Sequence, residues 1–157
     1  MKGNIMYERF TDRARKVMKL AEEEARRMRH DAVCPEHVLI GIIKERHGHA
    51  GNVLRDLGVT LEDLQADVER VLPASGDHEI TEIIPLTPIV EQLIAYAWEE
   101  AELLAHTYIG TEHLLLGLIR GHHGASYVLR ERDLPEEKIR AQVRIALGCD
   151  EAPASSE

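Results

Sequence analysis

The sequence predicts an all-α fold, a duplicated four-helix unit with about eight helices related by a pseudo-twofold axis. Hydrophobic residues make up 44% of the 157 residues, but Phe and Trp each occur once. The core must therefore come mainly from Leu, Ile, Val, Ala and Met, which suits packed helices. The chain also repeats itself, and apolar residues recur at helical spacing in both copies.

The internal repeat is visible at an offset of 76 residues. It aligns identical residues from Thr11 and Thr87 through to Gly48 and Gly124, and after a one-residue deletion the offset becomes 75. Each half alone would leave an apolar face uncovered, so we expect a single domain. The expected parts are an N-terminal extension at 1–5, one domain at 6–148 with repeats at 10–72 and 86–148 around a linker at 73–85, and a disordered tail at 149–157.

Four helices are expected in each repeat. The first follows Thr11 or Thr87, whose hydroxyls suit an N-cap, and Pro88 then occupies the first helical position. The second helix carries the repeated motif. The third is predicted at 50–57 and 125–132, and the fourth at 61–71 and 136–147. In the linker, Ile80, Ile83 and Ile84 predict a segment that lies extended against apolar surface.

The repeated motif reads "VCPEHVLIGII" in the first copy and "IGTEHLLLGLI" in the second. It places Glu36 and Glu112 in the first turn of a helix, where the helix dipole stabilises a carboxylate by ~0.3–1 kcal/mol without any ligand. The following residues, His37 and His113, are interpreted as capping or packing histidines. His30 and His106 stand before the turn, and we expect them to bond the last carbonyls of the preceding helix.

A metal or catalytic site is not expected. Neither copy has the two histidines at i and i+4 that a zinc-protease helix requires. The loop histidines could hold a transition metal weakly, but a loop role without metal is favoured; they are His47, His49, His122 and His123. Cys34 precedes a helix N-terminus, a setting that lowers a thiol pKa, yet no relay partner accompanies it. The alternative is a small metal-dependent hydrolase built on the Glu-His pairs.

The charge balance limits the partners. With 28 acidic and 19 basic residues the formal net charge is −9, which argues against nucleic acid or an anionic membrane as the main partner. The two cysteines, Cys34 and Cys149, and the absence of a long apolar span predict a reduced, cytoplasmic protein.

These motifs resemble a known family. The "MYERFTDRARKVMKLAEEEAR" that begins at Met6, the paired Glu-His motifs and the G-x-A-x-x-V-L from Gly48 to Leu54 are similar to the Clp N-terminal repeat domain. That domain stands at the front of Hsp100 AAA+ unfoldases of the ClpC and ClpA type, and the ClpC branch is the most similar. The resemblance covers roughly 6–148.

The resemblance implies a monomeric docking module without catalysis or cofactors. Its partners would be substrate polypeptides, adaptor proteins, the Clp ATPase and protease machinery, and proteins tagged with phosphoarginine. No G-x-x-x-x-G-K-[ST] occurs in the sequence, so no nucleotide site of that kind is expected. Two alternatives stay open: a free-standing protein that sequesters or regulates the same ligands, and a purely structural oligomerisation module.

The resemblance also implies ligand-binding residues. In the family, the Glu of each Glu-His motif meets the guanidinium of phosphoarginine, which assigns Glu36 and Glu112; a carboxylate can pair bidentately with this group. Thr11 and Thr87 would add hydroxyls if the first helix of each repeat begins beside the motif. Tyr7 and Phe10 are implied as residues of a hydrophobic groove.

The first copy departs from the family pattern. Where the family has Gly-Thr before the Glu, this chain has Cys34-Pro35, which removes a donor and a hydroxyl. The family's T-P-R-A has become Thr87-Pro88-Ile89-Val90, which removes a cation. We therefore predict an intact site at Thr111 and Glu112 and a weakened site at Glu36.

Overall fold

Eight helices make up the fold over the residues that the computed structural model describes, 7–75 and 83–148. The helices of the first repeat are α2 (Asp12–Arg27), α3 (Pro35–Glu45), α4 (His49–Asp56) and α5 (Leu61–Val71). Those of the second repeat are α6 (Pro88–Leu103), α7 (Thr111–Ile119), α8 (Gly124–Glu131) and α9 (Glu136–Leu147). The predicted all-α class and the doubled four-helix order are confirmed.

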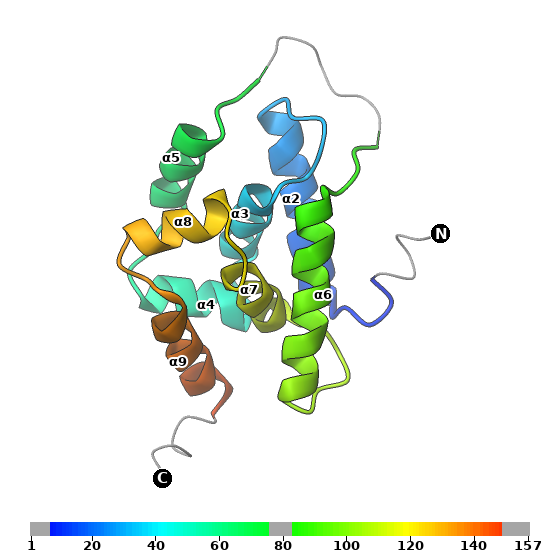
Figure 1. Ribbon diagram of the computed structural model, residues 1–157, viewed down its shortest axis with the longest axis vertical. Helices are drawn as coiled ribbons and strands as arrows, with labels where there is room; N and C mark the ends of the chain where they lie inside the picture. The colour runs from blue at the N-terminus through cyan, green and yellow to red at the C-terminus, as the bar shows by residue number, and fades with distance from the viewer. Residues whose placement is uncertain (1–6, 76–82, 149–157) are drawn as a thin grey trace.

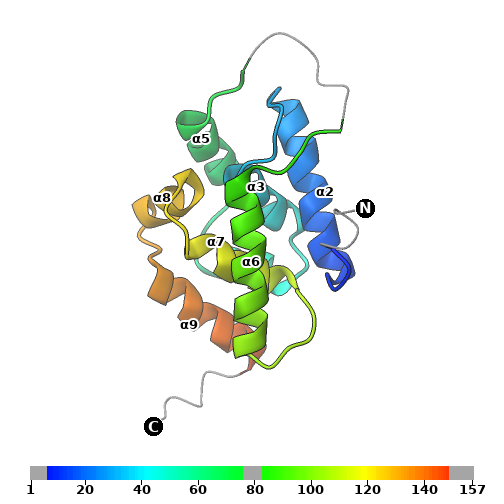
Figure 2. The same ribbon diagram turned by 45° about the vertical axis from the view of Figure 1, so that its right-hand side comes forward.

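The helices form three layers (Figure 1 and Figure 2). The long first helices α2 and α6 lie on one side, the motif helices α3 and α7 lie in the middle, and α4, α5, α8 and α9 lie on the other side. The closest helix pairs are α2 with α3 and α6 with α7, and further contacts cross between the repeats, such as α4 with α9 and α5 with α8. Within the described ranges, no helix combines the length and apolarity needed to cross a membrane.

The helix starts follow the predicted capping chemistry. Thr11 Oγ1 accepts the Ala14 N–H at 3.1 Å, and Thr87 Oγ1 accepts the Val90 N–H at 3.2 Å. Each threonine thereby satisfies one of the backbone donors that a helix start leaves without a partner. The predicted bounds of α5 and α9 are confirmed, while α4 and α8 each begin and end one residue earlier than predicted.

The glycine of each motif marks a close helix crossing. A Cβ on Gly41 would lie 2.5 Å from the carbonyl oxygen of Val17 in α2, and a Cβ on Gly117 would lie 2.5 Å from that of Leu93 in α6. Because backbone cannot yield as a flexible side chain can, only glycine lets these helices approach so closely. The small residue is thus repeated for packing between the first two helices of each copy.

A buried glutamate joins the same two helices in each repeat. Glu24 is 1% exposed and pairs with Arg27 and Lys44, while Glu100 is 4% exposed and pairs with Arg120 and Arg140. The Arg140 guanidinium binds Glu100 through two bonds of 2.8 Å each. Bidentate pairing compensates the cost of burying the charge. The sequence alignment matched the two glutamates without indicating this role.

The linker prediction is only partly correct. Ile84 is 6% exposed and packs against the core, but Ile83 is 89% exposed, so the prediction for Ile83 is wrong. The neighbouring Leu86 pairs with Val33 in an isolated parallel bridge, and this pairing turns one side chain inward and the next outward. Ile80, the extension at 1–5 and the tail at 149–157 lie outside the described residues.

Candidate functional site

Two short backbone bridges set the geometry of the site. The Thr11 N–H donates to the Ile109 carbonyl at 2.9 Å, and the Ile109 N–H donates to the Arg9 carbonyl at 2.9 Å. The symmetric bridge joins Val33 to Pro85 and Thr87. Each first helix therefore begins beside a Glu-His motif, and this motif belongs to the other repeat.

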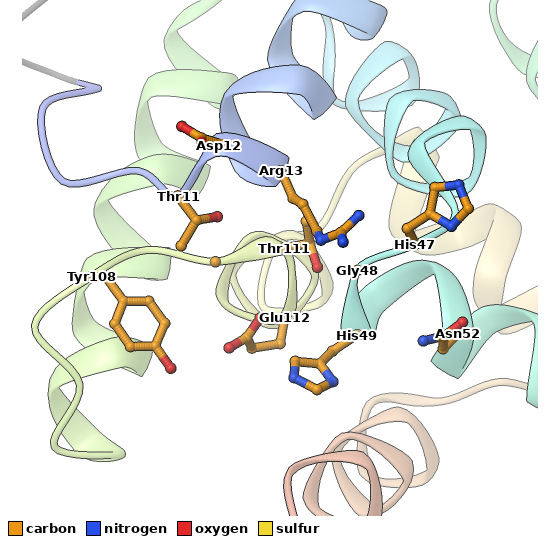
Figure 3. A pocket seen from close by; sticks show the side chains of 11 residues that line it. Thr11, Asp12, Arg13, His47, Gly48, His49, Asn52, Tyr108, Thr111 and Glu112 are labelled. Carbon is orange, nitrogen blue, oxygen red and sulfur yellow. The ribbon is translucent and has the colours of Figure 1, made fainter.

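This crossing places Thr11 beside Thr111 and Glu112, at a cavity of about 400 Å³ (Figure 3). Three segments line it: the start of α2, the start of α4 and the start of α7. The cavity is lined by Thr11, Asp12, Arg13, His47, Gly48, His49, Asn52, Tyr108, Gly110, Thr111 and Glu112. The cavity thus depends on both repeats.

Glu112 is a buried carboxylate at this cavity, with 3% of the residue exposed. In Figure 3 its side chain lies between those of Tyr108 and His49. The Glu112 side chain folds back over the turn before α7 and lies so close to it that a Cβ on Gly110 would be only 2.6 Å from Glu112 Oε1. Glycine at this position makes room for the carboxylate.

Thr111 and Arg13 complete the polar surface of the cavity. Thr111 Oγ1 accepts the Ala50 N–H at 3.1 Å, which ties the start of α7 to the start of α4 and leaves the hydroxyl proton free to donate. Arg13 lies 3.1 Å from Glu45 Oε2, whose other oxygen accepts the Gly48 N–H at 2.8 Å. The groups that line the cavity therefore include the carboxylates of Asp12 and Glu112, the hydroxyls of two threonines and Tyr108, and the guanidinium of Arg13.

The motif histidines cap their helices and bond a second histidine. His113 Nδ1 accepts the Gly110 N–H at 2.8 Å, and His113 Nε2 lies 2.9 Å from His106 Nδ1. The first repeat has the same arrangement, with His37 bonded to the Cys34 N–H and to His30. The capping interpretation of His37 and His113 is confirmed. His30 and His106 do bond last-turn carbonyls as expected, but through their backbone N–H groups, which donate to Ala25 and Ala101 at 2.9 Å each. Their rings bond the capping histidine instead.

A metal could be considered at His106, Glu112 and His113, whose ligand atoms lie within 4.8 Å of one another. The hydrogen bonds argue against it. Because His113 Nδ1 accepts a backbone N–H, the ring proton resides on Nε2, which donates to His106 Nδ1. His113 Nε2 and His106 Nδ1 are thus both used in this hydrogen bond. Metal ligation through His113 Nε2 would move the proton to Nδ1, against the Gly110 N–H.

The buried histidine of the first repeat predicts acid sensitivity. Burial, with His30 nearby, lowers the pKa of His37 from 6.5 to about 4. The unfolded chain therefore takes up a proton that the folded chain refuses, so this stability is present above about pH 6.5 and is lost as the pH falls towards 4. We expect the free energy of unfolding to drop by about 2 kcal/mol between pH 7 and pH 5 from this residue.

Urea unfolding of the wild type and of His37→Gln at both pH values measures this contribution. Glutamine at this third helical position can still accept the Cys34 N–H, so the variant keeps the cap. Its pH dependence should be smaller than that of the wild type by the stated amount. An identical pH dependence would assign the acid sensitivity to other groups.

The counterpart site at Glu36 has a different geometry. Proline stands where the second repeat has Thr111, and Glu36, 8% exposed, lies against the start of α8. A Cβ on Gly124 would overlap its carboxylate. Burial raises the pKa of Glu36, opposed by its own backbone N–H and by His30. Thr87 caps α6, and two residues later the apolar Ile89 stands at the position that corresponds to Arg13.

Cys34 is not an activated thiol. Burial, together with the negative charges of Glu36 and Asp31, raises its pKa to about 11. The expectation that its place before a helix lowers the pKa is wrong, because these effects outweigh the helix dipole.

The two aromatic residues predicted for a groove lie before α2. Phe10 is 4% exposed and belongs to the core, while Tyr7 is half-buried with its ring 4.9 Å from that of Phe10. Their role in a groove stays a prediction.

Residues 9–132 match the family described as the Clp repeat (R) N-terminal domain. An ATP-dependent Clp protease ATP-binding subunit ClpA homolog from Guillardia theta is 46% identical over 144 residues, 91% of this chain and 18% of the relative. The negative regulator of genetic competence ClpC/MecB from Bacillus subtilis (strain 168) is 40% identical over 153 residues, 97% of this chain and 19% of the relative. The chain thus spans less than a fifth of either relative.

Solved structures share the fold. The N-terminal domain of the caseinolytic protease associated chaperone ClpD from Arabidopsis thaliana superposes with a TM-score of 0.75 at 24% identity, covering 90% of this chain and 96% of that one. A ClpV N-domain in complex with a VipB peptide superposes with a TM-score of 0.68 at 12% identity, covering 92% and 91%. At these identities the likeness concerns the fold alone.

Proposed function

The chain belongs to the Clp repeat N-terminal domain family of the Hsp100 unfoldases, and on that premise we propose that it docks substrate polypeptides and adaptor proteins for a Clp ATPase and protease. Relatives that carry the same domain are named as ATP-binding subunits of Clp protease. A ClpV N-domain has been solved with a bound peptide. The proposal assigns recognition to this domain and no catalytic step.

For the cavity at Glu112 we propose phosphoarginine as the ligand. The observation that carries this proposal is the convergence of Thr11, Arg13, Thr111 and Glu112 in one cavity. Glu112 offers two acceptor oxygens to a planar guanidinium, while Arg13 and the hydroxyl protons of the threonines offer donors to a phosphate. The start of α4 adds the positive end of a helix dipole on the same side.

The two sites of the domain differ in this proposal. At Glu36 the carboxylate is directed at the start of α8, close against Gly124, and the residue that corresponds to Arg13 is Ile89 rather than a cation. A ligand there would have to displace the carboxylate and would find no guanidinium for its phosphate. We therefore assign ligand binding to Glu112 alone.

Titration with free phosphoarginine, followed through backbone amide shifts, tests the proposal. Amides at the starts of α2, α4 and α7 should shift together along one binding curve, because all three line the same cavity. Amides around Glu36 and at the start of α8 should stay in place at the same ligand concentrations. Equal affinity at both sites, or no response near Glu112, would contradict it.

A further inference from the structure

A second concave surface lies on repeat two, between α6 and the end of α7. It encloses about 340 Å³, and apolar groups from Ile89, Leu93 and Tyr96 line the α6 side. Ile89 is 50% exposed although it is a large apolar residue at a helix start. The Arg120 guanidinium lies over the Tyr96 ring, 4.0 Å from its centroid, and forms part of the opposite wall. We call this surface the α6 groove.

The first repeat has an ion pair at the corresponding place. There the position of Ile89 is taken by Arg13 and that of Gly121 by Glu45, and these two side chains form an ion pair of 3.1 Å across the helices. In repeat two both partners have changed, and an apolar side chain faces a glycine. The duplicated unit thus provides an internal comparison in which one copy is bridged and the other is open.

The charges around the α6 groove differ from those of the whole chain. Its described lining residues include one guanidinium, that of Arg120, and no carboxylate, although the chain carries a net charge of −9. The groove begins at Pro88, the first residue of α6, where the helix dipole is positive. Arg120 contacts the buried Glu100 at 3.4 Å, but Glu100 is mainly held by two bonds from Arg140, and the other partner of Arg120 is Glu99, which is 57% exposed. Such an exposed pair is weak and exchanges readily with a ligand carboxylate.

We propose that the α6 groove is a second docking surface, separate from the Glu112 cavity, for peptide segments in which a large apolar side chain is flanked by acidic residues. The apolar side chain packs on Ile89, Leu93 and Tyr96. A neighbouring carboxylate binds Arg120, which the stacking on Tyr96 holds in place. A substrate or adaptor that bears such a segment would then contact the domain at two places, which raises its overall affinity through the effective concentration of the second contact.

Three synthetic peptides test the proposal on the whole chain, with binding followed by amide shifts. They share a length and carry Leu-Phe flanked by glutamates, Leu-Phe flanked by lysines, and Ser-Ser flanked by glutamates. The first should shift amides around Ile89 and Arg120, and the other two should bind at least about tenfold more weakly. Added salt should weaken the binding of the first peptide, because it screens the attraction between the glutamates and Arg120.

A matched pair of variants locates the surface. Ile89→Asp removes the apolar contact and should weaken the acidic peptide by about tenfold or more. Leu103→Asp makes the same change on the same helix, at a residue that is 78% exposed and about 21 Å further along the axis, and should leave binding unchanged. Equal loss in both variants, or stronger binding of the lysine-flanked peptide, would overturn the proposal. Displacement of the peptide by phosphoarginine would overturn it too, because it would place the peptide in the Glu112 cavity.

Discussion

Replacing Glu112 by Gln should weaken phosphoarginine binding by about 100-fold, because the ligand guanidinium loses its charged partner in a buried site. The amide keeps the size of the side chain but offers one acceptor oxygen and two N–H donors, which face a group that only donates. Isothermal titration with free phosphoarginine measures the loss.

Glu36→Gln is the matched control, since it makes the same change at the corresponding position of the other repeat. We expect it to change the affinity by less than about threefold, because Glu36 already lies against the start of α8. Thermal unfolding should show both variants folded; a first-turn carboxylate contributes only ~0.3–1 kcal/mol through the helix dipole. A similar loss in both variants would mean that the two sites are still equivalent.

Replacing Glu100 by Ala should lower the free energy of unfolding by about 3–5 kcal/mol, the range measured when one partner of a buried ion pair is removed. The carboxylate is 5% exposed and holds Arg140 through two bonds of 2.8 Å. Without it, Arg140 and Arg120 lose their common anion between α6, α7 and α9. Urea unfolding measures the effect through the midpoint and the slope.

The adjacent glutamate is the control for this prediction. Glu99 also contacts Arg120, at 3.0 Å, but is 57% exposed. Glu99→Ala should therefore cost less than about 1 kcal/mol, as solvent and salt screen such a pair. Comparable losses at Glu99 and Glu100 would show that burial does not decide the strength of these pairs.

The helices of this fold are predictable because their signals are local. Thr11 and Thr87 indicate helix starts, because the threonine hydroxyl accepts a backbone N–H three residues later. The spacing of apolar residues predicts the extent of α5 and α9. The residues within each segment decide where a helix begins and ends, so a single sequence is sufficient to predict these bounds.

The site and its supports are less predictable because they join distant residues. An internal alignment shows that Thr11 and Thr87 are equivalent positions. It gives no reason to expect Thr11 beside Glu112, although the two residues line the same cavity. The pairing of Glu100 with Arg140 spans forty residues. The high pKa of Cys34 likewise depends on burial and on the nearby acids Glu36 and Asp31 rather than on its place before a helix.

The two crossed bridges have a consequence for the ancestry of the domain. A contact in which the start of one unit's first helix binds the motif loop of the other, and the reverse, is the isologous interface of a twofold homodimer. An unfused ancestor with this geometry would build two identical cavities and could alter neither alone, since every substitution would appear in both. In one continuous chain that constraint is absent. Thr111 and Arg13 can stand at one cavity while Pro35 and Ile89 stand at the corresponding positions of the other repeat, so that recognition by one half can be independent of the other half's sequence.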